Sequence, residues 1–463
     1  MPARQFSRRS LFSRPKIIVL IMAILLATGL AAVTSVQPAR SATTASYTVS
    51  TVLVGANGAI GALYQPTSPD PEQSTAFLLS HDIDNLIGST PCVQLAQRGF
   101  TVLCVKSEFT EGALVNWDSL ALDVGAGVTY LRGLSAVKHV LLVGYSAGGP
   151  DMAYYQNVAQ NGVATCEAAA RLDPCTSALA HLPPADGVVL LDSIPGALSG
   201  LSTLDASVVN ESNVLQTNPS LNMFSPKNGY NTSGPSDYST AFINRYTEAQ
   251  GARMSRLINE AQGLLAKVEA GKGQYTDDAP MLVGRVNARI WQADLDLLSH
   301  TKGKFPLISP QSPDGSAPQV VRSVRVATAD PVADDQWDQT DGGFTASSFL
   351  STAALKAPDF QVSADSITGV DWASSNTSTI LNVKGIRSPL LIMAMTGHYW
   401  VVPSEMYYDA ATSTPSKTLA FVEGASHGLT PCSACATTAG EFGDTVAETF
   451  NYMARWAVQH YGA

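Results

Sequence analysis

The feature that most constrains this chain is a short run of small residues directly after an apolar segment. Residues 139–143 (HVLLV) have the composition of a buried strand, and residues 144–148 (GYSAG) follow at once. Glycines two positions before and after a serine let neighbouring backbone pass close to a tight turn between a strand and a helix. We therefore predict that Ser146 lies at such a turn, with its hydroxyl available as a nucleophile.

Apolar segments of strand length recur along the chain and alternate with segments of helical pattern. An opening hairpin or meander is expected over residues 46–64, and further strand segments cover residues 76–80, 100–105, 187–191, 389–394 and 418–422. This alternation predicts an α/β fold with a mostly parallel sheet and helices on both of its faces.

The segment between the two groups of strands has a different composition. Ser, Asn, Gly and Pro dominate residues 198–239, and apolar stripes from Met254 and from Val283 indicate two helices. We expect this segment to form a large, mainly helical cap inserted into the fold. The predicted parts are an export signal (1–41), the first part of the core (42–196), the cap (197–387) and the second part of the core (388–463).

A serine hydroxyl is a weak nucleophile, so it needs a base, and a third group must orient that base. His427 is the candidate base because it lies in the loop directly after the last predicted strand. Two carboxylates are candidates for the third group. Asp192 ends the strand segment at 187–191, and Glu405 follows Pro403.

The turn around Ser146 and the later His427 make residues 46–463, apart from the predicted cap, resemble the α/β-hydrolases. In that family the nucleophile, the acid and the histidine follow one another in this order. Members usually carry the acid just after the penultimate strand, but residues 395–403 of this chain contain no carboxylate. Some lipases of this fold carry it one strand earlier, where Asp192 stands, and Glu405 is the alternative.

The resemblance also implies an oxyanion hole made of two N–H donors. One donor is expected to be the backbone N–H of Ala147, which follows the nucleophile. The other should come from the loop after the strand at 76–80. Relatives often have His-Gly in this loop, whereas this chain has Asp82 and Ile83 after His81, so these two are the candidates.

Three aromatic residues after the penultimate strand, His398, Tyr399 and Trp400, are candidates for substrate contact, and packing is an equal role for Tyr399 and Trp400. We expect a serine hydrolase that cleaves carboxylic esters of a small-molecule or lipid-like kind through an acyl-enzyme. Hydrolysis of a lactone, an amide or a carbon–carbon bond is the alternative within this fold. A non-catalytic binding protein on a decayed hydrolase scaffold is the alternative from another class.

The N-terminal segment is typical of an export signal. Five basic residues precede the apolar residues 17–33, and residues 38–42 (PARSA) follow. Residues 7–12 resemble a twin-arginine signal, although ordinary secretory signals also contain adjacent arginines. We expect a secreted protein without a stable membrane span once the signal is removed, and an uncleaved N-terminal anchor is the alternative.

Charge and motifs exclude several classes of partner. The signal contains six basic residues and no acid, so its removal changes the formal net charge from −10 to −16. An acidic surface of this kind repels nucleic acid. The chain has no dinucleotide-binding glycine loop, no Walker loop and no His-Glu-x-x-His motif, so we expect no cofactor and no metal.

All six cysteines follow the signal, and their even number suits disulfides in an exported protein. Cys166 and Cys175 enclose a short polar loop, and Cys432 and Cys435 lie just after His427. We predict these two local bridges and leave the pairing of Cys92 and Cys104 open. A single Cys-x-x-Cys does not supply the four ligands of a zinc site.

Overall fold

The computed structural model describes residues 44–55, 58–68, 71–107, 114–329 and 343–462. The predicted export signal over residues 1–41 lies outside these ranges. Within the described part of the chain, no helix has both the length and the apolar character that crossing a bilayer requires.

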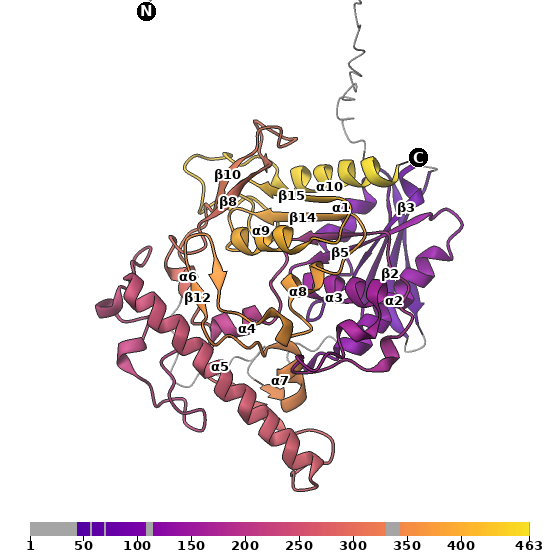
Figure 1. The fold of residues 1–463 in the computed structure, drawn as a ribbon. Coiled ribbons are helices and arrows are strands. Elements are labelled where there is room, and N and C mark those ends of the chain that lie inside the picture. The colour runs from indigo at the N-terminus through magenta and orange to yellow at the C-terminus, as the bar shows by residue number, and fades with distance from the viewer. Residues whose placement is uncertain (1–43, 56–57, 69–70, 108–113, 330–342, 463) are drawn as a thin grey trace, which may run out of the picture. The chain divides into compact units, whose positions relative to one another are not determined.

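A nine-stranded sheet organises the described chain (Figure 1), and its strands follow the order β1-β2-β4-β3-β5-β6-β14-β15-β9. Strands β1 and β2 form an antiparallel hairpin, β2 also pairs antiparallel with β4, and all other neighbours are parallel. The predicted mostly parallel sheet is therefore confirmed. The strands are β1 (Tyr47–Val54), β2 (Ala59–Pro66), β3 (Thr75–Leu79), β4 (Thr101–Lys106), β5 (His139–Tyr145), β6 (Gly187–Leu191), β9 (Leu307–Ile308), β14 (Leu390–Met395) and β15 (Lys417–Val422).

Helices cover both faces of this sheet, which explains why its central strands are apolar throughout. Successive strand residues point to opposite faces: Leu142 packs in one buried cluster and Leu141 in another. Helices α2 (Trp117–Arg132), α3 (Gly148–Asn161) and α9 (Val401–Ala410) contribute to the first cluster. Helices α1 (Thr90–Ala96) and α10 (Thr445–Tyr461) contribute to the second.

The residues between β6 and β14 build a third buried cluster around the long helix α5 (Thr240–Glu269). The Ser239 side chain caps this helix by accepting from the Phe242 N–H. Its predicted stripe is buried at Met254 and Leu257. The other elements are α4 (Leu198–Thr203), β7 (Pro280–Leu282), α6 (Ile290–Ala293), β8 (His300–Phe305), β10 (Gln319–Arg322), β11 (Gly343–Thr345), α7 (Ala346–Thr352), β12 (Gln361–Val362), β13 (Ile367–Thr368) and α8 (Thr379–Val383).

The second predicted helix of this segment is wrong for most of its length. Only α6 is helical, whereas Arg285 and Asn287 have positive φ angles of 54° and 70° that an α-helix excludes. A buried ion pair holds this part of the chain in place, because Arg285 lies 2.8 Å from Asp205. The segment also contributes β9 to the edge of the main sheet, beside β15.

The structure contains three disulfides. Cys166–Cys175 and Cys432–Cys435 are the two predicted local pairs, and Cys92–Cys104 joins α1 to β4. Bridges of this number are typical of proteins that fold in an oxidising compartment.

Candidate active site

Ser146 lies on a sharp turn between β5 and α3, as the glycine pattern predicts. Its φ angle of 57° is in the left-handed region, which non-glycine residues rarely adopt outside constrained sites. A Cβ atom on Gly144 would lie 2.6 Å from the carbonyl oxygen of Gly148, and one on Gly148 would lie 2.5 Å from that of Ser80. Both glycines are therefore required by close backbone contacts.

Asp192 occupies the equivalent position on the neighbouring strand. Because β5 and β6 are parallel, their carboxyl ends meet, and the Ser146 N–H donates to Leu191 O at 3.1 Å. The Asp192 N–H donates to Met393 O on β14, and its Oδ1 accepts from the Met395 N–H at 3.2 Å. These contacts hold the fully buried carboxylate between two strands.

His427 joins these two residues from the loop after β15. Its Nε2 lies 2.7 Å from the Ser146 Oγ, and its Nδ1 lies 2.6 Å from the Asp192 Oδ2. The Tyr145 hydroxyl donates to the carbonyl oxygen of His427, and the two rings stack. The structure thus brings Ser146, His427 and Asp192 into the arrangement of a serine–histidine–aspartate triad.

Glu405, the other candidate for the acid, does not lie at the histidine. The structure therefore does not support it as the group that orients His427. It lies on α9, where its buried carboxylate accepts from the backbone N–H groups of Lys302 and Gly303 at 2.8 and 2.7 Å. Glu405 thus joins α9 to β8.

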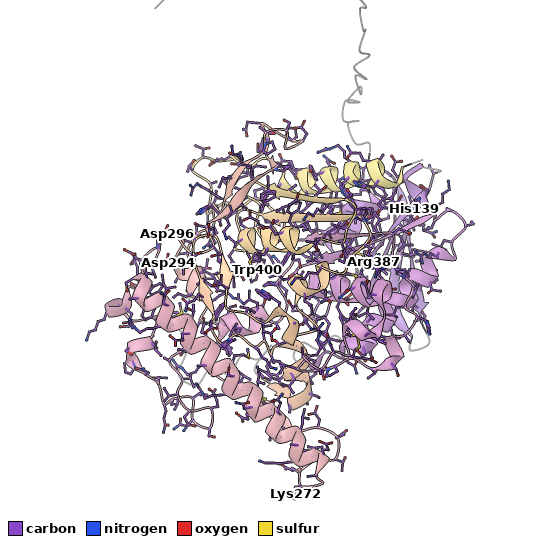
Figure 2. The ribbon with its side chains drawn as sticks, in the orientation of Figure 1. His139, Lys272, Asp294, Asp296, Arg387 and Trp400 are labelled. Atoms are coloured by element: carbon purple, nitrogen blue, oxygen red, sulfur yellow. A yellow bond between two sulfur atoms is a disulfide. The ribbon has the colours of Figure 1, made fainter. Side chains whose placement is uncertain are left out.

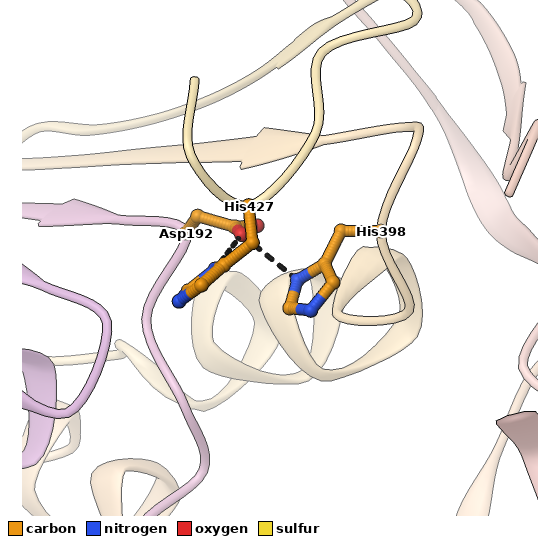
Figure 3. Close-up of side chains that lie close together, drawn as sticks. All are labelled: Asp192, His398 and His427. Carbon is orange, nitrogen blue, oxygen red and sulfur yellow. Dashed lines mark hydrogen bonds and ion pairs between the residues drawn. The ribbon is translucent and has the colours of Figure 1, made fainter. Parts of the chain in front are cut away.

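His398 contacts the acid instead of a substrate pocket (Figure 3). Its Nδ1 lies 2.9 Å from the same Asp192 oxygen that faces His427, though the ring nitrogen is not aligned for a directed hydrogen bond. The next two residues also depart from the prediction. The Tyr399 hydroxyl accepts from Arg289, and Trp400, labelled in Figure 2, is buried in the cluster around α5. None of the three lines the cavity beside Ser146.

The pKa values of Asp192, His398 and His427 are shifted in different directions. Burial alone would raise the pKa of Asp192, but the charges and contacts of His398 and His427 lower it well below its usual value. Burial lowers the pKa of His427, and the hydrogen bond and charge of Asp192, with Asp84, more than offset this, so its pKa is raised above 6.5. Burial lowers the pKa of His398, despite the opposing effect of Asp192. A proton therefore binds to His427 in preference to His398.

One of the two candidate oxyanion donors in the loop after β3 has its N–H engaged by another group. The Ile83 N–H donates to the His81 Nδ1 at 3.1 Å, as does the Asp84 N–H at 3.0 Å. The Ile83 N–H is therefore not free to donate to an oxyanion, in contrast to the prediction. Burial lowers the pKa of His81 to about 4, opposed by Asp84 and assisted by His427, so this ring is neutral and its Nδ1 can accept. Ala147 remains: in the described chain its N–H has no hydrogen-bond partner.

A cavity of about 170 Å³ adjoins this turn. Ala147, Asp82 and Ile83 line it beside the turn, and apolar side chains from the segment between β6 and β14 line much of the rest. Arg289 is the one basic residue among the described residues of its lining. No sequence pattern marks Arg289, because its partners Ser202 and Tyr399 are distant along the chain.

Asp192, His398 and His427 also form the one group of three or more potential metal ligands in the described ranges whose ligand atoms lie within 4.8 Å of one another. The Nδ1 atoms of both histidines face Asp192, and the Nε2 of His427 faces Ser146. These side chains are thus committed to one another and to the serine.

The strand order and the turn at Ser146 together define the α/β-hydrolase fold.

No model of a protein family and no curated protein matches the chain. Among solved structures, proline iminopeptidase from Mycobacterium smegmatis has 12% identity and a TM-score of 0.38, with 89% of this chain and 98% of that chain covered. An esterase domain from Rhodothermus marinus has 11% identity and a TM-score of 0.36, with the same coverage. A hypothetical protein from Pseudomonas aeruginosa has 12% identity and a TM-score of 0.38, covering 92% of this chain and 96% of that one.

Proposed function

We propose that the protein is an exported serine hydrolase that cleaves carboxylic esters through an acyl-enzyme on Ser146. The observation that carries this proposal is the continuous chain of short contacts from the Ser146 hydroxyl through His427 to Asp192. A serine held in this way loses its proton to the histidine as it attacks a carbonyl carbon.

Each residue has a defined role in the proposed reaction. His427 accepts the serine proton through Nε2 and later delivers it to the leaving alcohol. Asp192 holds the other ring nitrogen, fixes the tautomer and stabilises the imidazolium. The N–H of Ala147 points to the developing oxyanion, where a preorganised donor is worth about 3 kcal/mol. In the second half of the reaction, water attacks the acyl-enzyme with His427 again acting as the base, which releases the acid and restores the Ser146 hydroxyl.

An ester substrate is favoured by the lining of the cavity. Its apolar side chains, among them Trp117, Phe344 and Phe349, suit an apolar acyl or alcohol group. We assign residues 197–387 the role of a cap, because Phe344, Phe349 and Met254 belong to this segment. The three disulfides support export.

A fluorophosphonate probe tests the proposal, since it labels activated serines and not inert ones. We expect stoichiometric labelling of Ser146 and hydrolysis of 4-nitrophenyl esters. Ser146→Ala should abolish labelling and lower kcat on the order of 10⁵-fold, and His427→Ala should have a comparable effect. Ser255→Ala, an exposed serine on α5, is the matched control and should behave as the wild type. An unlabelled wild-type protein would instead indicate a decayed hydrolase scaffold.

A further inference from the structure

Among the described residues, only neutral groups hold the guanidinium of Arg289 in place. Its Nε donates to the Ser202 hydroxyl at 3.0 Å, its Nη1 to the Tyr399 hydroxyl at 2.9 Å, and its Nη2 to Ser199 O at 3.4 Å. The rings of Tyr399 and Trp400 lie 5.3 and 5.7 Å from its central carbon. In the ranges that the structure describes, no carboxylate lies within ion-pair distance of Arg289.

The buried arginines of the same segment differ from Arg289, which is half-buried. Arg253 pairs with Glu211, and Arg285 pairs with Asp205. Arg325 has no ion pair among the described residues, but backbone carbonyls, such as that of Leu297, accept its N–H groups, and it does not line the cavity. Among the described residues, Arg289 is thus the arginine that lines the cavity and has no anionic partner.

This arrangement leaves capacity to bind an anion. A guanidinium has five N–H donors, and three hydrogen bonds are accounted for above. The rest of the cavity lining is mainly apolar, and a charge in such surroundings is stabilised most by a paired opposite charge. A carboxylate fits the planar guanidinium best, because both can form two parallel hydrogen bonds.

Two residues that adjoin the reacting serine line the same cavity. Ala147 follows Ser146 directly, and Ile194 donates its N–H to Ser146 O at 3.0 Å; both line the cavity. Of the lining residues that the structure describes, Asp82 is the one acidic side chain, and it lies 3.3 Å from His81. A substrate carboxylate would be repelled by Asp82 and attracted by Arg289.

We propose that the cavity selects esters that carry a second, free carboxylate beyond an apolar spacer, and that Arg289 binds this carboxylate. The proposal rests on the ester hydrolysis inferred above and deepens it by naming a substrate class, of which half-esters of dicarboxylic acids are the simplest members. The apolar walls bind the spacer, and Tyr399 and Ser202 orient the guanidinium.

Two 4-nitrophenyl esters of equal chain length test this specificity: the hexanoate, which is neutral, and the half-ester of adipic acid, which has a terminal carboxylate. We expect the wild type to have the higher kcat/KM for the adipate. Arg289→Gln should lower kcat/KM for the adipate roughly 10- to 100-fold, the value of a charge-assisted hydrogen-bond pair, and change it less than about 3-fold for the hexanoate. Arg245→Gln, the same change at an exposed site on α5, should alter neither value.

A binding measurement separates this proposal from the reaction itself. Monoethyl adipate should bind Ser146→Ala protein in calorimetry, and adding Arg289→Gln should weaken binding at least about 10-fold. Binding that needs Arg289, in a protein that neither labels nor turns over, would overturn the esterase and keep the carboxylate site. Equal use of both esters, with no effect of Arg289→Gln, would overturn the carboxylate site and keep the esterase. If Arg289→Gln does not fold, Arg289→Lys retains the charge without the planar fork and should give an intermediate loss.

Discussion

His398 lies against His427, with ring centroids 4.4 Å apart, and both imidazoles face the same oxygen of Asp192. Figure 3 shows this convergence on one buried carboxylate. The two rings share one negative charge, so a proton on one disfavours a proton on the other. The shifts described above favour that proton on His427, so the imidazolium that forms when the serine is deprotonated lies on the base and not on His398.

The first prediction concerns pH. His427 must be neutral to accept a proton, and its pKa is raised in the folded protein. We therefore expect kcat/KM to fall as the pH drops through a midpoint above 6.5, as measured with a soluble ester. His398→Gln leaves the charge of Asp192 to His427 alone and should move this midpoint to higher pH. A midpoint that stays in place would show that His398 has no electrostatic effect on the base.

The sign for stability is opposite. Because the pKa of His427 is higher in the folded than in the unfolded state, its protonated form stabilises the fold below pH 6.5. This contribution is lost as the pH rises through the folded pKa. Thermal melts of wild type and His427→Gln should therefore differ more at pH 6 than at pH 9.

The second prediction compares two buried carboxylates. Asp192→Asn should lower kcat by up to about 10⁴-fold, because the amide favours the wrong tautomer of His427. Glu405→Gln should retain activity but lower the free energy of unfolding by about 1–3 kcal/mol, since it weakens the bonds from Lys302 and Gly303. Steady-state kinetics and urea unfolding of both variants check this ranking. The reverse ranking would place the acid on α9.

The third prediction concerns the turn at Ser146. Gly144→Ala would place a Cβ 2.6 Å from backbone atoms of both Gly148 and Gly149, and backbone cannot shift there without displacing Ser146. We expect loss of soluble protein or of activity. Gly263→Ala on α5 is the control, because nothing lies within 4 Å of its added Cβ. It should stabilise the helix by about 0.5–1 kcal/mol. Comparable behaviour of the two variants in thermal melts would contradict the close contacts.

The fourth prediction separates two disulfides. Replacing Cys432 and Cys435 by alanine should cost about 2 kcal/mol of unfolding free energy, as expected for a very short loop. It should also lower kcat/KM, because the Cys432 N–H donates to Gly424 O beside the His427 loop. Replacing Cys92 and Cys104, which close a longer loop away from the histidine, should cost about 3 kcal/mol without changing KM. Equal kinetic effects would show that the Cys432–Cys435 bridge does not support the histidine.

The parts of the site that local backbone geometry dictates were predictable from sequence. The turn at Ser146 needs glycines at fixed positions, and the sequence has glycines at these positions. Asp192 and His427 follow strands, and parallel neighbours bring strand ends together. The expectation that Ile83 donates to an oxyanion was wrong, because the neutral ring of His81 accepts its N–H. Neither the protonation state of His81 nor the orientation of its ring can be predicted from the local sequence.

The amino-acid sequence by itself determined the alternation of strands and helices, the turn at Ser146 and the order of the three candidate residues, since each depends on short-range periodicity and steric limits. Tertiary structure alone decided that Glu405 anchors β8, that His398 contacts Asp192, and that Arg289 lines the cavity. These outcomes depend on which distant groups compete for a buried charge or hydrogen bond. That competition takes place between residues that are 103, 110 and 206 positions apart, and no local pattern encodes it.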